Sequence, residues 1–393
     1  MAQPLAGVRI ADFSHVIAGP LATHFLCLLG AEVIKIEPAG GDAMRYYTRR
    51  EELRGMAEPF MGANAGKKSV VLDLKSDEGR AAAQAICACS DIVVENFRPG
   101  VAGRLGLGYE ALAEAHPGLI YCSISGFGQT GPMRDYPAID QVIQSVSGLM
   151  TLSGAPSDDP TRIGFPIVDT YCALMAAFAI LAAYTQRQGD PEGRGQYVDV
   201  AMLDTTMVMM SSVLGQILIS GAAPERTGNR GFSGAPTADT FETGDGQITI
   251  GAVQQNQVAR LFRALGLADL LEDERFALPD ARMVNQDALQ AELSRAFAGR
   301  TAVEWEEILN HAGVPAGKVR SVPEALELDQ IAGRDLFLDA ETANPAVPHA
   351  KILGAGFRFA HDGPGHSGKV PALGEHTDEV LAMIAQQAKR DAS

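Results

Sequence analysis

Residues 8–36 read VRIADFSHVIAGPLATHFLCLLGAEVIKI, and this stretch decides the fold. An apolar run at 8–13 is followed by Gly19-Pro20, an amphipathic segment at 21–29 and a second apolar run at 33–36. Two short apolar runs separated by one helical segment indicate a strand–helix–strand unit, because parallel strands need a crossover connection of about this length. The stretch therefore predicts two parallel strands with a helix packed over them.

The same alternation continues along the chain. Further strands are predicted at 69–74, 91–95 and 119–124, with helices at 77–89 and 109–115. Two long helices, 170–187 and 203–221, then flank a turn and a strand within 193–200. Strands alternating with helices predict an α/β fold with an open parallel sheet.

The chain is longer than one hydrophobic core usually serves, with 393 residues. Its amino-acid composition changes near residue 222, where Gly, Pro and Thr become frequent. One strand and three helices are predicted after this point. They are expected at 247–251, 256–265, 288–297 and 303–312. We therefore predict a large domain over 1–222, a smaller α+β domain over 223–321, and a return to the large domain over 322–393, with a helix at 375–386.

The charge balance limits the classes of partner. The chain carries 48 Asp and Glu against 32 Lys and Arg, a net charge of −16, so a broad nucleic-acid-binding face is not expected. A local basic pocket for a phosphorylated ligand remains compatible with this balance. The longest apolar stretches, 171–184 and 207–219, fall short of the roughly 20 residues of a membrane span. We expect both to be buried helices and expect no membrane partner.

The cysteines and histidines point to a metal-free protein in a reducing compartment. Five cysteines without a CxxC pair, and an N-terminus without signal-peptide features, predict a cytoplasmic location. The eight histidines show no HxH or HxxxH spacing, so no metal site is expected.

Asp169 lies after a proline-bearing turn, at the start of a long apolar helix. A carboxylate there can cap the helix, transfer protons, or act as a nucleophile that becomes acylated. The helix N-terminus would lower its pKa and keep it ionised, and the apolar neighbours would shield an acyl intermediate from water. The residues alone leave capping and catalysis both open.

Three further parts of the sequence each allow a structural and a functional interpretation. Asp140 precedes an apolar run and is either a helix cap or a site residue. The loop 228–236 either presents backbone N–H groups to an oxyanion or only connects two domains. Residues 126–131 match G-x-G-x-x-G, but Pro132 follows where a dinucleotide fold opens a helix, which argues against nucleotide-cofactor binding. A glycine-rich loop after a strand is still a favourable place for a ligand.

An ordered set of short motifs resembles the class III CoA-transferase family (CaiB/BaiF type), which includes formyl-CoA transferase and carnitine CoA-transferase. The motifs lie at 5–13, 18–20, 29–38, 64–69, 94–100, 126–132, 193–200, 312–317 and 373–378. Each is weak alone, but together they cover nearly the whole chain in order.

The resemblance implies a discontinuous Rossmann-like large domain, a small domain, and a homodimer of two interlinked chains. It implies a CoA-transferase that moves CoA from an acyl-CoA donor, succinyl-CoA being one expected donor, to a short carboxylic or dicarboxylic acid. Asp169 would be the acyl acceptor, forming an aspartyl anhydride and then an aspartyl-CoA thioester. Apart from CoA itself, a substrate, the chemistry requires no cofactor.

The resemblance also implies site residues. Asp140 would lie near the nucleophile, and Gly231 and Gly234 would belong to a glycine loop over the active site. The expected CoA contacts are His15, Val16, Ala18 and Gly19 beside the pantetheine, and Lys75, Asn96, Phe97, Arg98 and Arg104 near the nucleotide.

The chain departs from the formyl-CoA transferase pattern in three places. Ile17 replaces a glutamine, Phe232 and Ser233 interrupt the glycine run, and Pro38 replaces a basic residue. The first two disfavour an acceptor as small as oxalate.

Three alternative functions remain. An α-methylacyl-CoA racemase-like enzyme has a histidine just before the position of Asp140, where this chain has Ile139. A nicotinamide dehydrogenase would have to use the Gly126 loop, and a protein that only binds acyl-CoA would need no nucleophile.

Overall fold

The computed structural model describes residues 2–365 and 368–391 and divides into two compact units. The first unit consists of Met1–Leu149, Arg162–Gly221 and Arg334–Ser393, and the second of Met150–Thr161 and Ala222–Gly333. This division differs from the predicted boundaries in two places, because the second unit also takes Met150–Thr161 and extends to Gly333 instead of residue 321.

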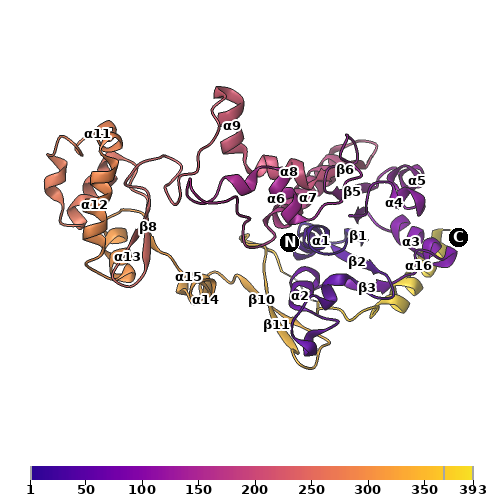
Figure 1. Ribbon diagram of the computed structural model, residues 1–393. Helices are drawn as coiled ribbons and strands as arrows, with labels where there is room; N and C mark the ends of the chain where they lie inside the picture. The colour runs from indigo at the N-terminus through magenta and orange to yellow at the C-terminus, as the bar shows by residue number, and fades with distance from the viewer. Residues whose placement is uncertain (1, 366–367, 392–393) are drawn as a thin grey trace. The chain divides into compact units, whose positions relative to one another are not determined.

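The first unit is built on a six-stranded parallel sheet in the order β3-β2-β1-β4-β5-β6 (Figure 1), as the predicted open α/β sheet requires. Its strands are β1 (Arg9–Asp12), β2 (Glu32–Glu37), β3 (Lys68–Val71), β4 (Ile92–Glu95), β5 (Ile120–Ser125) and β6 (Gln196–Ala201). This is the Rossmann order, in which the chain reverses its direction of winding between β1 and β4. Ligands of such sheets bind at the carboxyl ends of the strands beside that reversal.

Helices cover both faces of this sheet. On one face α1 (Ala18–Leu28) and α7 (Ile167–Gly189) pack against each other and against the strands. On the other face α3 (Asp77–Ala88) and α16 (Thr377–Asp391) share a core with Ile34, Val70 and Val93. Figure 1 shows α16, at the C-terminal end, beside α3 and β3. Strands covered on both faces are largely apolar, which is why they appear in the sequence as short apolar runs.

The remaining elements of the first unit are shorter. They are η1 (Ala43–Tyr46), η2 (Glu51–Leu53), α2 (Glu58–Asn64), α4 (Val101–Arg104), α5 (Tyr109–Ala115), α6 (Asp140–Val146), η3 (Leu149–Thr151, which ends in the second unit), α8 (Met202–Met209), α9 (Ser211–Ser220), β10 (Phe337–Glu341) and β11 (His349–Leu353).

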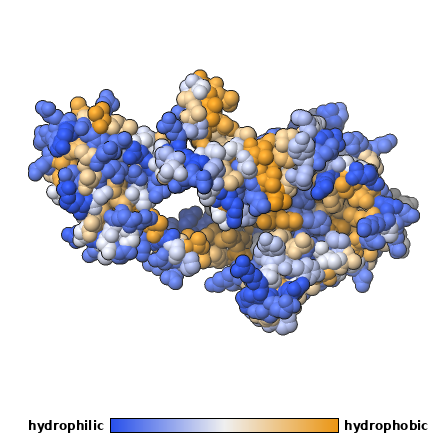
Figure 2. Space-filling view, in the orientation of Figure 1, coloured by the Kyte–Doolittle hydropathy of each residue, from blue (hydrophilic) through white to orange (hydrophobic). Residues whose placement is uncertain are grey.

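The prediction of one helix over 203–221 is wrong. Helices α8 and α9 meet at Met210 with a bend of 78°. The serine pair Ser211-Ser212 follows the break, and serine side chains compete with the helix ladder for backbone hydrogen bonds. The expectation that 207–219 is buried is also wrong for α9, which buries none of its residues. Figure 2 shows hydrophobic residues exposed on this helix.

Helix α7 is long and apolar enough to cross a membrane, and α8 with α9 passes the same test as a bent pair, among the residues that the structure describes. In the structure α7 packs on α1, α8, β5 and β6 and buries Val168, Cys172 and Ala176. These contacts bury one side of α7, whereas Leu174 and Phe178 are 52% and 64% exposed, so the expectation of a buried helix is confirmed only in part.

The second unit has a three-stranded antiparallel sheet, β7 (Thr240–Glu242), β8 (Gln247–Ile250) and β9 (Ala316–Lys318). Its helices are α10 (Gln255–Ala264), η4 (Ala268–Leu271), α11 (Pro279–Val284), α12 (Gln286–Phe297), α13 (Ala302–His311), α14 (Val322–Leu326) and α15 (Asp329–Ala332). Phe241, Phe262, Phe297 and Trp305 form much of its core. The sequence missed β7 and β9, because three residues are too few to display a strand period.

Candidate active site

A cavity of about 730 Å³ opens in the first unit at the carboxyl ends of β1, β4 and β5. It is lined by His15 after β1, Asn96 after β4 and Ser125 of β5, and by Asp140 and Asp169 at the starts of α6 and α7. The cavity therefore lies at the reversal point of the sheet, where ligand binding is expected.

Asp140, and not Asp169, caps helix α7. The backbone N–H groups of Val168 and Asp169 donate to Asp140 Oδ2 at 2.8 and 3.2 Å. Pro166 occupies the N-cap position and has no side-chain capping bond. Within the described residues, the Asp169 carboxylate forms no hydrogen bond, although it is partly buried. Asp169 therefore does not cap the helix, and its carboxylate is available for chemistry.

The pKa of Asp169 is raised to about 7, first by burial and second by the charge of Asp140. The expectation that the helix N-terminus lowers this pKa is wrong. The N–H donors of the first turn of α7 are directed at Asp140, so desolvation and a like charge are what act on Asp169. Both protonation states of Asp169 are therefore populated near neutral pH.

Gln144 ties together both ends of the segment that leads to Asp169. Its Oε1 accepts the backbone N–H of Ile163 at 2.9 Å, and its Nε2 donates to Asp140 Oδ1 at 2.6 Å. The Gln144 side chain is fully buried, and we call this arrangement the Gln144 brace. The sequence analysis missed Gln144, although a polar residue four positions after Asp140 on one helix face was a usable signal.

The glycine at position 126 of the G-x-G-x-x-G match has a steric role in the fold. A Cβ on Gly126 would lie 2.1 Å from the Cβ of Ala138, so only glycine lets the segment before Asp140 cross the end of β5. No helix opens after Gly131, and the next one begins at Asp140. The expectation that Pro132 and the residues after it form a loop and not a helix is confirmed.

The loop after β1 is held in a strained conformation over the cavity. Asn96 accepts the His15 N–H and donates to the His15 carbonyl, both at 2.8 Å. Val16 has φ 70°, which is costly for a β-branched residue, and its N–H donates to both carboxylate oxygens of Asp42 at 3.2 Å. Burial and Lys35 lower the pKa of His15, so its imidazole is neutral at pH 7. Ala18 and Gly19 begin α1; Ala18 lines the cavity and Gly19 does not.

Buried ion pairs hold the loop after β1 in place. Lys35 Nζ lies 3.0 Å from Asp42 and donates to the Ser14 carbonyl at 2.8 Å, and all these side chains are buried. Lys67 lies 3.0 Å from Asp12. Burial alone would raise the pKa of Asp12, but the charges of Lys67 and Lys35, with hydrogen bonds from Ser14 and Thr23, together hold that pKa at about 2. Hydrogen-bonded charges of this kind fix a loop because breaking any one leaves its partner buried and unpaired.

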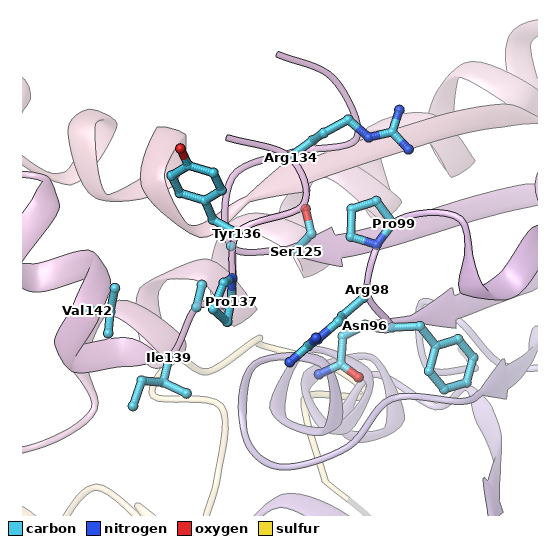
Figure 3. A pocket seen from close by; sticks show the side chains of 12 residues that line it. Asn96, Arg98, Pro99, Ser125, Arg134, Tyr136, Pro137, Ile139 and Val142 are labelled. Carbon is cyan, nitrogen blue, oxygen red and sulfur yellow. The ribbon is translucent and has the colours of Figure 1, made fainter. Parts of the chain in front are cut away.

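A second cavity of about 370 Å³ (Figure 3) shares five lining residues with the first, namely Asn96, Ser125, Gly126, Ala138 and Ile139. Phe97 and Arg98, two of the predicted nucleotide contacts, line it together with Arg134 and Tyr136, which the sequence analysis missed. Figure 3 shows Arg98 and Arg134 entering this region from different loops.

The other predicted site residues lie elsewhere. Lys75 and Arg104 are exposed and line neither cavity. Gly231 and Gly234 belong to the second unit, where the Gly231 N–H donates to Ala238 and the Gly234 N–H to Gly231. In this conformation neither N–H is free for an oxyanion. Among the described residues, no group of three or more His, Cys, Asp or Glu could hold a metal ion.

Known proteins match the chain over nearly its full length. The model of CoA-transferase family III matches residues 5–377. An acetyl-CoA:oxalate CoA-transferase of Acetobacter aceti is 37% identical over 92% of this chain and 92% of its own length. A succinate–glutarate CoA-transferase of Agrobacterium fabrum is 33% identical over 97% and 96%.

A solved structure agrees with these relatives. The crystal structure of a CaiB/BaiF family protein from Brucella suis has a TM-score of 0.86 and 32% sequence identity, and the match covers 98% of this chain and all of that one. Because sequence and fold both match from end to end, the chain belongs to CoA-transferase family III and is a CoA-transferase, an enzyme that uses CoA thioesters as substrates.

Proposed function

We propose that Asp169 is the covalent relay through which the enzyme moves CoA from an acyl-CoA to a free carboxylic acid. The observation that carries this proposal is the free Asp169 carboxylate in the cavity, with its helix capped by Asp140 instead. A nucleophile must have an unengaged oxygen when the substrate arrives, and this oxygen is unengaged.

The steps balance without a metal or redox partner. Asp169 attacks the thioester carbonyl, the C–S bond breaks, and CoA thiolate leaves a mixed anhydride on Asp169. The thiolate attacks the aspartyl carbonyl, which releases the donor acid and forms an aspartyl-CoA thioester. The acceptor carboxylate then displaces the thiolate, forming a second mixed anhydride, and the thiolate takes the acceptor acyl group and frees Asp169.

We place the pantetheine along the His15–Val16 loop and the CoA nucleotide beside the second cavity. Arg98 and Arg134 line that cavity, and guanidinium groups pair well with phosphate oxygens. The strained Val16, 45% exposed, lines the first cavity and leads the thiol towards Asp169. No comparable support places Lys75 and Arg104 at the ligand.

The acceptor we propose is a dicarboxylic acid larger than oxalate, with succinyl-CoA as a donor. The named substrates of the two relatives, oxalate and glutarate, are both dicarboxylic acids. Ile17 lines the cavity where the formyl-CoA transferase pattern has glutamine, and this apolar side chain suits the methylene groups of a longer acid.

Trapping the intermediate tests the relay. The enzyme is incubated with succinyl-CoA, quenched with hydroxylamine and digested, and mass spectrometry is expected to find a hydroxamate at Asp169. Asp169→Ala is expected to bind CoA without transfer, while Asp77→Asn, on the exposed start of α3, keeps full activity. Transfer that proceeds while the Asp169 peptide never carries an adduct would exclude the relay.

One observation favours a second function. A carboxyl group with a pKa near 7 is also suited to removing an α-proton, as a racemase requires. Ile139, which lines the cavity, supplies no acid or base for the opposite face. Incubation of a 2-methylacyl-CoA in D₂O without an acceptor acid separates the two: deuterium at the α-carbon supports the racemase, and its absence supports the transferase.

We further propose an interlinked homodimer that works in the cytoplasm. Leu218 and Ile219 of α9 are 83% and 89% exposed, and Phe178 of α7 is 64% exposed, which is unusual for apolar side chains unless a partner covers them. Cys27, Cys87, Cys122 and Cys172 form no disulfide, which suits a reducing compartment.

A further inference from the structure

The cavity that contains Asp169 has a single permanent positive charge. Among its lining residues, all within the described part of the chain, Arg162 is the only Lys or Arg, while Asp140 and Asp169 contribute two carboxyl groups. The His15 imidazole is neutral at pH 7 because burial and Lys35 lower its pKa. A substrate that carries a second carboxylate into this cavity can therefore pair it with only one permanent cation of the lining, Arg162.

Arg162 is not used to neutralise an acidic side chain. Across the described residues no ion pair includes Arg162, and its Nη1 donates only to the Ile163 carbonyl at 3.1 Å. The remaining guanidinium donors of this exposed side chain are available. Arg162 thus lines the same cavity as Asp169 without an acidic partner of its own in the described chain.

The backbone beside Arg162 is fixed relative to Asp169. The Gln144 brace holds the N–H of Ile163 at one end and Asp140, the cap of α7, at the other. Arg162 and Asp169 therefore lie at the two ends of one braced segment on the wall of one cavity. This placement suits an acid whose two carboxylates are separated by a short chain, with one carboxylate for the nucleophile and the other for the guanidinium.

We propose that Arg162 binds the second carboxylate of a dicarboxylic acyl group, and so selects dicarboxylic over monocarboxylic acids. This inference rests on the proposed CoA transfer and adds its substrate class. A guanidinium suits the task because its planar fork matches a carboxylate in a bidentate pair. Without it, the lining of this cavity would offer the second carboxylate two aspartate side chains and no Lys or Arg.

The test compares acids of matched length. Transfer from acetyl-CoA to four- and five-carbon dicarboxylic acids, and to the monocarboxylic acids of the same lengths, is measured by mass spectrometry of the acyl-CoA products. The wild type is expected to prefer the dicarboxylic acids. In Arg162→Met their kcat/KM is expected to fall roughly 10- to 100-fold, mostly through KM, as the loss of a charge-assisted pair predicts.

The control reactions locate the effect. Arg162→Met is expected to change kcat/KM for the monocarboxylic acids by less than about twofold, because they never meet the guanidinium, and Arg162→Lys is expected to be intermediate. Arg54→Met, at an exposed arginine outside the cavity, is expected to match the wild type with every acid.

The outcomes that overturn the inference differ from those that overturn CoA transfer. Equal losses for both acid classes in Arg162→Met, or a wild type that prefers monocarboxylic acids, would reject the role of Arg162 and leave CoA transfer standing. The absence of transfer to every acid from acetyl-CoA and from succinyl-CoA would reject the proposed function, and the role of Arg162 with it.

Discussion

At the scale of single residues, Asp140 and Asp169 show how environment divides work between two identical side chains. Asp140 accepts three hydrogen bonds, from two backbone N–H groups and from Gln144. Asp169 accepts none within the described residues, and burial and its neighbour's charge raise its pKa to about 7. The Asp140 carboxylate therefore holds the start of α7 in place, and the Asp169 carboxylate is left reactive.

The raised pKa predicts the pH dependence of the reaction. Because the ionised carboxylate attacks, kcat/KM is expected to rise with pH, reach half its plateau near pH 7 and level off above it. Asp140→Asn removes the like charge and keeps an oxygen to cap α7, so the midpoint is expected to move to lower pH. Rates measured from pH 5 to 9 check both expectations.

A control is needed because burial also raises the pKa of Glu95, at the end of β4, to about 7. Ser123 donates to Glu95, and the neighbouring charge that raises the pKa of that carboxyl is Asp199, not Asp140. A midpoint that stays unchanged in Asp140→Asn would therefore assign the pH dependence to Glu95 or another group and contradict its assignment to Asp169.

The same pKa predicts a gain in stability from Asp169→Asn. The folded state holds its proton up to about pH 7 and the unfolded chain only to its ordinary value of 3.8, so wild-type stability falls as pH rises through that window. Asparagine has no charge to bury. The free energy of unfolding of the variant is expected to exceed that of the wild type by on the order of 2–4 kcal/mol at pH 8.

Urea unfolding at pH 8 and pH 5 provides the measurement. The difference between variant and wild type is expected to shrink at pH 5, where the wild-type carboxyl is mostly protonated in the folded state. An Asp169→Asn variant that is less stable than the wild type at pH 8 would show that the carboxylate is stabilised in the fold, against its assignment here.

At the scale of elements, the Gln144 brace is what sets the first turn of α7. Gln144→Leu keeps the size of the side chain but removes both bonds, and leaves the Ile163 N–H without its acceptor. We expect a loss of about 1–3 kcal/mol in unfolding free energy and a fall in kcat of roughly 10- to 100-fold with little change in KM for CoA. Gln84→Leu on α3 removes a single exposed hydrogen bond to Gly106 and serves as the matched control.

Gln144→Glu separates positioning from folding. A carboxylate there still accepts the Ile163 N–H but places a negative charge beside Asp140. This added charge near Asp169 is expected to raise the pKa of Asp169 further, so the midpoint of the pH–rate profile moves to higher pH. A purely structural role would lower activity equally at every pH, and a profile of unchanged shape in Gln144→Glu would support that reading instead.

At the scale of the whole molecule, exposed apolar side chains predict the assembly. Sedimentation is expected to give twice the chain mass of 41.5 kDa. Interlinked chains cannot separate without unfolding, so tagged and untagged dimers mixed under native conditions are expected not to exchange. The double variant Leu218→Glu, Ile219→Glu is expected to impair assembly, whereas Gln216→Glu on the same helix is expected to leave it intact.

A monomeric mass in sedimentation would contradict the proposal that a partner chain covers α9. Rapid exchange of subunits would contradict only the proposal that the two chains are interlinked. Either result would leave the chemistry of the first cavity unaffected, since the residues that line it all belong to the first unit of a single chain.

Much of the fold and part of the site could be predicted from sequence. Apolar runs of strand length between helical segments gave the parallel sheet, because strands covered on both faces must be apolar throughout. Ordered short motifs identified the family. Six predicted residues do meet in one cavity, namely His15, Val16, Ala18, Asn96, Asp140 and Asp169.

Only the tertiary structure decided which carboxylate caps α7, in which direction the pKa of Asp169 moves, and what Gln144 and Arg162 adjoin. The sequence shows Asp169 at a helix start, but not that Asp140, 29 positions earlier, takes the N–H groups of that helix. Periodicity records which face of an element is buried. Desolvation and long-range hydrogen bonds depend on what the rest of the chain packs against that face, and this is settled only when the chain has folded.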